Sequence, residues 1–180
     1  NRRPDVVKAV GFAVSAATLG LSVALLWEFA PHSGAFQFTE SARWIPYLGV
    51  RWQLGVDGIS LFMIVLTGLL FPIGLLASTN VERPKAFAVW MLLLEAAVMG
   101  VFAGLDLLVF FLFFEIVLVP MYFLIGGWGY DQRIYAATKF FLYTMVGSAF
   151  MLVGIVATAL LARSDLGHMS FDLIEIAEGA

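Results

Sequence analysis

The sequence has no cysteine among its 180 residues, and it has few charged side chains. Without cysteine, the chain forms no disulfide, thiolate metal site or cysteine-ligated iron–sulfur cluster. Only 13% of the residues are Asp, Glu, Lys or Arg, whereas a soluble domain has about 25%. Because 62% of the residues are hydrophobic, too few charges remain for a water-exposed surface, which argues against an ordinary soluble enzyme.

The sequence also lacks the short motifs of several binding sites. The patterns GxxxxGK[ST], GxGxxG after a strand and HExxH do not occur, so no known motif predicts nucleotide or zinc binding. The net charge of -3 leaves no basic face for nucleic acid. We therefore expect no catalytic residue, no metal site and no redox site in this chain.

Long apolar stretches are what the sequence does contain. Each is long enough to cross a membrane as a helix, and lipid offers an unpaired backbone no hydrogen-bond partner. The first stretch exceeds the roughly 7–15 apolar residues of a signal peptide and precedes no clean cleavage site. The sequence predicts an all-α membrane protein with five transmembrane helices, at about 9–30, 58–77, 86–104, 107–125 and 136–162.

The connections complete a single membrane domain over residues 1–180. The surface connection 31–57 contains several β-formers, and Phe36–Thr39 and Val50–Leu54 are expected to pair as a hairpin at the membrane surface. Residues 163–180 form an acidic tail. The helices about 86–104 and 107–125 are separated by almost no loop and are expected to form a tight pair.

Lysine and arginine are unevenly divided between the two sides of the predicted bundle. The side that holds the N-terminus carries Arg2, Arg3, Lys8, Arg83, Lys85 and Arg133, and the other side carries Arg43, Arg51 and Arg163. Short cytoplasmic segments are richer in these residues. The bias places the N-terminus in the cytoplasm and the hairpin and acidic tail on the extracytoplasmic side.

Three charged residues lie within the predicted helices, where charge is costly and usually functional. Glu115 lies near the middle of 107–125, and Pro120 kinks this helix and frees the carbonyl of Ile116. Lys139 lies about two turns into 136–162, where Thr138, Tyr143 and Thr144 add hydroxyl groups. Helix rise puts Glu115 and Lys139 at depths about 10 Å apart, so we expect no direct salt bridge.

Glu95 is the third charged residue and lies at a depth similar to that of Glu115, so the two carboxyls could relay a proton. Each charge also has a structural interpretation. The two glutamates could be static groups paired with neighbouring helices, and Lys139 could extend its amine to the headgroups.

The sequence contains three distinctive motifs, LGVDGISL at Leu54–Leu61, FFEIVLVPMYFLI at Phe113–Ile125 and RIYAATKFFLYT at Arg133–Thr144. They resemble the antiporter-like membrane subunits of respiratory complex I, and most closely the M-type subunit (chain 4) of NADH–quinone oxidoreductase. Many members carry Trp where this chain has Phe114. The family has about fourteen helices in two inverted halves, so the resemblance implies a fragment of the first inverted repeat.

The resemblance also implies a function. These subunits are taken to conduct protons, driven by quinone reduction elsewhere in the complex, and Glu115 and Lys139 match charged residues of the family's fifth and sixth helices. Flavin, iron–sulfur clusters and quinone are then expected in partner subunits. The expected partners are L-, N- and K-like chains and the lipid of a bacterial-type inner membrane.

Other functions share parts of this pattern. A D-type subunit of a multisubunit Na⁺/H⁺ antiporter and a membrane hydrogenase subunit have the same architecture and the same Glu and Lys pattern. A structural membrane module without transport is an alternative of another class.

Overall fold

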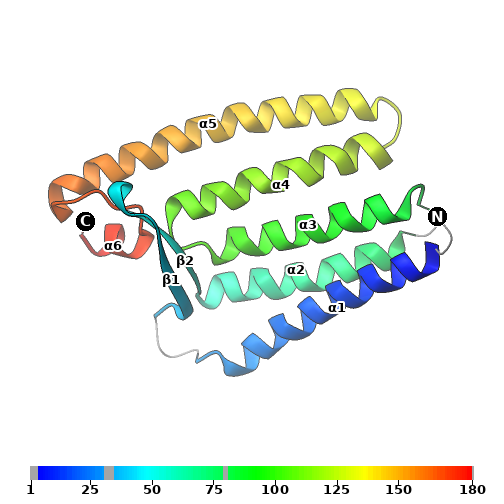
Figure 1. Cartoon of the computed structure of the whole chain (residues 1–180), viewed down its shortest axis with the longest axis horizontal. Coiled ribbons are helices and arrows are strands. Elements are labelled where there is room, and N and C mark those ends of the chain that lie inside the picture. The colour runs from blue at the N-terminus through cyan, green and yellow to red at the C-terminus, as the bar shows by residue number, and fades with distance from the viewer. Residues whose placement is uncertain (1–3, 31–34, 79–80, 180) are drawn as a thin grey trace.

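The computed structural model describes residues 4–30, 35–78 and 81–179, which form a bundle of long helices with a hairpin at one end (Figure 1). Five of the helices are long and apolar enough to cross a membrane, which confirms the predicted fold class. In chain order the elements are α1 Pro4–Glu28, β1 Gln37–Ile45, the 3-10 helix η1 Pro46–Leu48, β2 Val50–Val56, α2 Gly58–Ala77, α3 Pro84–Ala103, α4 Leu107–Trp128, α5 Arg133–Leu166 and α6 Leu173–Gly179.

The helices pack in chain order, and α1 also contacts α3. Small residues allow this close approach, because lipid-embedded helices associate through van der Waals packing rather than burial from water. A Cβ atom added to Gly68 of α2 would lie 3.1 Å from the Cα of Leu19 in α1, and one added to Gly11 would lie 3.3 Å from the Cβ of Ala88 in α3. Larger side chains at these positions would push the helices apart.

Asp57 begins α2 with a capping box. Its carboxylate accepts the backbone N–H of Ser60 at 2.7 Å, and the Ser60 hydroxyl accepts the N–H of Asp57 at 2.9 Å. These bonds satisfy helix N–H groups that otherwise have no partner. The backbone hydrogen bond from Ser60 is also the main reason that the pKa of Asp57 lies below its ordinary value.

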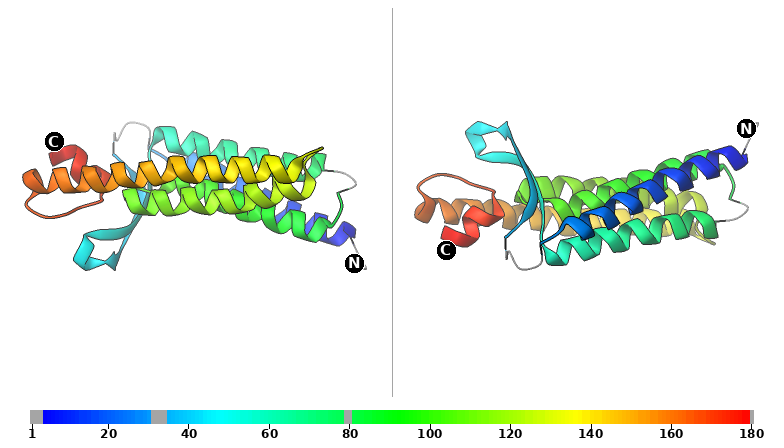
Figure 2. Two further views of the ribbon diagram at one scale, coloured as in Figure 1. Left: turned by 90° about the horizontal axis from the view of Figure 1, so that it is seen from above. Right: turned by 90° about the horizontal axis from the view of Figure 1, so that it is seen from below.

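The predicted hairpin is present but pairs differently from the prediction. Strand β2 includes the predicted segment 50–54, whereas β1 continues to Ile45, so that Leu54 pairs with Glu40 and Val50 with Ile45. The turn sets this register, because Gly49 adopts a left-handed conformation with φ of 75° at the end of η1. Figure 2 shows the hairpin projecting sideways from the end of the bundle.

The predicted acidic tail is folded rather than extended from the bundle. Its first residues continue α5 to Leu166, and the chain then turns back at Gly167 towards the hairpin. Phe171 is only 2% exposed and packs with Val50, Ile155 and Ala159 in a core cluster below the hairpin. The sequence does not indicate this packing, because the acidic residues around Phe171 predict a segment that is exposed to water.

Three segments meet at Asp106, the N-cap of α4, and we call this place the Asp106 junction. The fully buried carboxylate accepts the N–H groups of Arg51 in β2 and of Leu108 and Val109 in α4, at 3.0, 2.8 and 3.2 Å. The backbone N–H of Leu107 bonds to the carbonyl of Phe171 at 2.8 Å. Burial raises the pKa of Asp106, and these backbone donors oppose the rise.

We predict that Asp106→Ala in the full-length subunit lowers its thermal stability, because three backbone N–H groups lose their acceptor together. Each buried donor left unpaired costs about 1–3 kcal/mol. Thermal unfolding of the purified protein in detergent measures the change. The control is Asp131→Ala, which removes an exposed carboxyl from the turn before α5; equal melting of the two variants would contradict the role of the junction.

Candidate functional site: charged residues within the membrane helices

One stripe of α4 faces α5, and Glu115 belongs to it. The rings of Tyr122 and Phe141 lie 5.6 Å apart, a Cβ at Gly126 would lie 3.5 Å from that of Ala137, and Phe111 packs on the Ile155 cluster. With 3.6 residues per turn, positions 111, 115, 122 and 126 lie on one side of the helix. The carboxyl of Glu115 therefore belongs to the interface between α4 and α5.

The same contacts place Glu115 level with Ser148 of α5. Positions 137, 141, 144, 148 and 155 form the matching stripe of α5. Because Tyr122 lies opposite Phe141 and Gly126 lies opposite Ala137, the residue opposite Glu115 is Ser148 or lies within about one turn of it. Ser148 is 4% exposed. The sequence analysis missed it, and the available signal was a hydroxyl within an otherwise apolar run.

Glu115 has unused hydrogen-bonding capacity. Its side chain is half-buried, and its Oε1 atom is buried without a hydrogen-bond partner among the described residues. The Ser148 hydroxyl donates to the carbonyl of Met145 at 3.0 Å, and the Thr144 hydroxyl donates to that of Phe140 at 2.8 Å. Each hydroxyl oxygen can still accept a hydrogen bond. The interface thus holds one carboxyl oxygen without a hydrogen-bond partner and two hydroxyl oxygens that can each accept a further hydrogen bond.

Lys139 lies on the other side of α5. It is about 200° around the helix from Ala137, which contacts α4. Its side chain is exposed, and its Nζ atom lies 5.7 Å from the centre of the Tyr135 ring. Lys139 is also nine residues, or about 14 Å, along α5 from Ser148. The expected absence of a direct salt bridge with Glu115 agrees with this placement.

Glu95 faces α1 rather than α4. Ala88, seven residues earlier on α3, lies against Gly11 of α1, and seven residues are two helical turns. Glu95 is 2% exposed and lies against Ser15, which is fully buried. Ser15 Oγ and Glu95 Oε1 form no hydrogen bond with any residue that the structure describes.

The predicted similarity in depth between Glu95 and Glu115 agrees with the structure, but the two carboxyls do not meet. The stacked rings of Trp90 and Phe123 and the contact of Gly100 with Phe113 fix the register of α3 and α4. This register places Glu115 within about one turn of the level of Glu95. Glu95 nevertheless lies about 140° around α3 from Gly100, so the two carboxyls face different neighbouring helices, and a proton relay between them stays a prediction.

Pro120 lies inside α4, which continues as one helix to Trp128, three residues beyond the predicted end. Since proline has no N–H, the carbonyl of Ile116 lacks its helical partner, next to Glu115. The predicted kink stays a prediction. Within the described parts of the chain, no three His, Cys, Asp or Glu side chains lie close enough to hold a metal ion.

We predict that Gly126→Cys with Ala137→Cys forms a disulfide under mild oxidation. Their Cβ atoms would lie 3.5 Å apart, and disulfides need about 3.5–4.5 Å. Gly126→Cys with Lys139→Cys is the control and is expected to stay reduced, because Lys139 faces away from α4. Peptide mass spectrometry of the oxidised protein detects the bond, and equal crosslinking of both pairs would refute the assigned faces.

Comparisons with known proteins show what this chain is similar to. The family described as NADH:quinone oxidoreductase/Mrp antiporter, TM, matches residues 104–177. F(420)H(2) dehydrogenase subunit M of Methanosarcina mazei is 40% identical over 98% of this chain and 36% of that protein. NADH-quinone oxidoreductase subunit M of Rhodobacter capsulatus is 44% identical over 92% of this chain and 32% of that protein.

A solved structure shows a similarity in fold as well. A chain of respiratory complex I from Thermus thermophilus with bound NADH superposes with a TM-score of 0.75 and 31% identity, over 98% of this chain and 38% of that chain. This chain therefore spans about a third of the length of the relatives it matches. Residues 104–177 therefore carry the domain of the NADH:quinone oxidoreductase/Mrp antiporter family, and over nearly all of its length the chain is similar to part of M-type subunits.

Proposed function

We propose that this chain is part of the proton-translocating M subunit of an NADH–quinone oxidoreductase and carries protons through Glu115. The observation that supports this most is the buried, unpartnered Oε1 atom of Glu115 on the face of α4 that contacts α5. A carboxyl in this position takes up and releases protons inside the membrane. The identity with M subunits favours this function over a D-type antiporter subunit, a hydrogenase subunit or a structural module.

The proposed path follows the interface between α4 and α5. A proton on Glu115 passes through water to the hydroxyls of Ser148 and Thr144, which lie on the facing stripe of α5. Lys139, on the far side of α5, directs its charge away from this interface towards other parts of the subunit. Moving one charge across 100 mV is worth about 2.3 kcal/mol, so a change in the charge near Glu115 can couple proton movement to a redox step.

The redox chemistry is proposed to take place in partner subunits. Flavin, iron–sulfur clusters and quinone belong there, since this chain has no cysteine to hold such a cluster. L-, N- and K-like chains are the proposed membrane neighbours. The relatives' names include both NADH and F(420)H(2) as donors, and we take NADH because it also occurs in the name of the matching family.

We propose that the chain lies in the inner membrane of a bacterial-type cell, with its N-terminal end in the cytoplasm. The start of α1, the connection before α3 and the turn before α5 lie at one end of the bundle (Figure 1). Lys8, Arg83, Lys85 and Arg133 are at this end, and Arg2 and Arg3 precede α1 in the sequence. The bias of basic residues towards the cytoplasm supports this orientation.

In the intact complex, we predict that Glu115→Gln lowers proton pumping and the coupled quinone reductase rate by about tenfold or more. The amide is close in shape but cannot exchange a proton, and a positioned proton-transfer group contributes about 10²–10⁴-fold to a rate. Glu115→Asp keeps part of the activity, and Ser148→Ala gives a smaller loss than Glu115→Gln. Acidification by reconstituted vesicles and quinone reduction are measured together.

The matched control is Glu28→Gln, which changes an exposed carboxyl at the end of α1 and leaves both rates unchanged. If Glu115→Gln pumps protons and reduces quinone at the wild-type rates, Glu115 has no part in proton transfer.

The orientation is tested with two single cysteines. Tyr47, in the turn of the hairpin, is 85% exposed, and Tyr130, in the turn before α5, is 97% exposed. A membrane-impermeant maleimide added to spheroplasts is expected to label Tyr47→Cys and to leave Tyr130→Cys unlabelled. Inverted vesicles give the opposite result. The reversed pattern would overturn the proposed orientation.

A further inference from the structure

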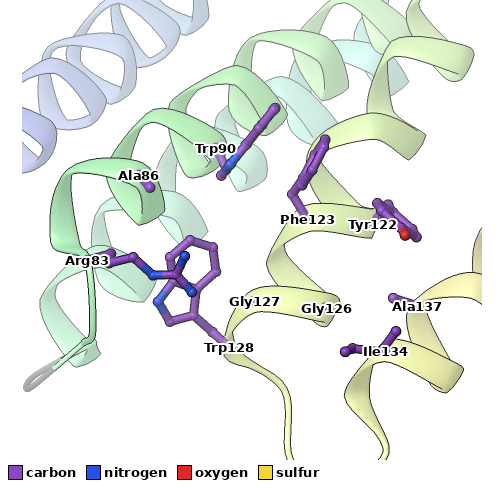
Figure 3. A pocket seen from close by; sticks show the side chains of 10 residues that line it. All are labelled: Arg83, Ala86, Trp90, Tyr122, Phe123, Gly126, Gly127, Trp128, Ile134 and Ala137. Atoms are coloured by element: carbon purple, nitrogen blue, oxygen red, sulfur yellow. The ribbon is translucent and has the colours of Figure 1, made fainter.

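A pocket of about 350 Å³ lies between α3, α4 and α5 at the end of the bundle that holds the N-terminus (Figure 3). Its inner wall is the stacked pair Trp90 and Phe123, whose ring centres lie 4.3 Å apart with an angle of 12° between the planes. Tyr122, Ile134 and Ala137 extend the lining, and two glycines leave space beside them. The glycines are Gly126 and Gly127.

The mouth of this pocket carries a positive charge. Arg83 precedes α3, is exposed, and holds its guanidinium carbon 5.9 Å from the centre of the Trp128 ring. The Trp128 indole is fixed in turn, because its N–H donates to the carbonyl of Glu82 at 2.6 Å. The described residues contain one ion pair, between His168 and Glu175 in the C-terminal segment. No described carboxylate is therefore paired with Arg83.

A second basic residue lies close by. Arg133 lines an adjoining pocket, which shares Gly127 and Trp128 with the first and also contains Glu82. Arg83 precedes the first residue of α3, Trp128 is the last residue of α4, and Arg133 is the first residue of α5. Tryptophan and basic residues at the ends of spans lie at the level of lipid headgroups. The charged mouth therefore lies at the membrane surface and the aromatic wall within the hydrocarbon.

We propose that this pocket binds one anionic phospholipid, with its phosphate on Arg83 and the upper part of one acyl chain against Trp90 and Phe123. The guanidinium fork matches phosphate geometry, and the only charged side chain that lines the pocket is Arg83. The volume is within the range of about 300–1,000 Å³ of small-ligand pockets, so the remainder of the lipid lies in the bilayer. The bound lipid joins α3 to α5, because Arg83 and Ile134 lie on opposite sides of the pocket.

The test uses the intact complex in phosphatidylcholine vesicles that contain a small fraction of a lipid with a photoreactive diazirine near the top of one acyl chain. The headgroup of the probe is phosphatidylglycerol in one arm and phosphatidylcholine in the other. Mass spectrometry then locates the labelled residues. We expect phosphatidylglycerol to label Phe123, Tyr122 or Ile134 more than phosphatidylcholine does.

Arg83→Gln is expected to reduce the labelling by phosphatidylglycerol about fivefold, which corresponds to about 1 kcal/mol for one basic residue at an anionic surface. It lowers the labelling by phosphatidylcholine less, because the choline of that headgroup offsets the charge of its phosphate. The matched control is Lys85→Gln, which removes an exposed charge two residues further along that does not line the pocket. This variant keeps the preference for the anionic lipid.

A second pair of variants fills the pocket without removing charge. A Cβ atom at Gly127 meets no atom within 4 Å, so Gly127→Leu enters the pocket without a backbone clash and is expected to reduce labelling. Gly147→Leu also starts from a position with open space around its Cβ, does not line the pocket, and leaves labelling unchanged.

Four results overturn the proposal. The two headgroups label the pocket equally, no label reaches the pocket because protein covers it, or assembled Arg83→Gln complexes are labelled like the wild type. The fourth is loss of labelling on addition of soluble glycerol phosphate, which would identify the site as one for a free phosphate. The readout is binding, so it is independent of proton pumping.

Discussion

The buried carboxylate of Asp106 is the interaction on which the arrangement of this chain most depends. It accepts N–H groups from the hairpin and from the first turn of α4, and the C-terminal segment bonds to the backbone on either side of it. Because α4 starts at this fixed point, the depth of every later residue on α4 is set by helical rise. Glu115, nine residues further on, therefore lies about 14 Å from the junction.

The two faces of α4 then separate the charged residues of the membrane helices. One face receives Phe113 against Gly100 of α3, and the other places Glu115 against α5 near Ser148. Glu95 is directed to Ser15 of α1 and Lys139 to the outside of α5. The described residues thus hold three separate polar sites rather than one chain of charges. Glu115 lies on the α4 face towards α5, whose facing stripe carries the hydroxyls of Ser148 and Thr144, whereas Glu95 lies against the hydroxyl of Ser15 on α1.

Part of this arrangement could be predicted from the sequence, and each failure has its own physical cause. Apolar runs were sufficient to predict the five helices, whereas the functional roles of Glu115 and Lys139 stay predictions. The helices are apolar on all sides, so their periodicity could not show that Glu95 faces α1 or that Ser148 faces Glu115. The extent of β1 depended on a left-handed glycine in the turn, and the folded tail depended on the single buried side chain of Phe171.

The position of Pro120 has a mechanical consequence. The segment from the Asp106 junction to Glu115 contains no proline or glycine, so it acts as a stiff rod with a complete set of helical hydrogen bonds. The weakened turn at Pro120 lies beyond the carboxyl, on the side away from the junction. A movement of the Asp106 junction would therefore carry Glu115 with it, and any bending of α4 would be easiest at the turn 116–120, between Glu115 and Trp128.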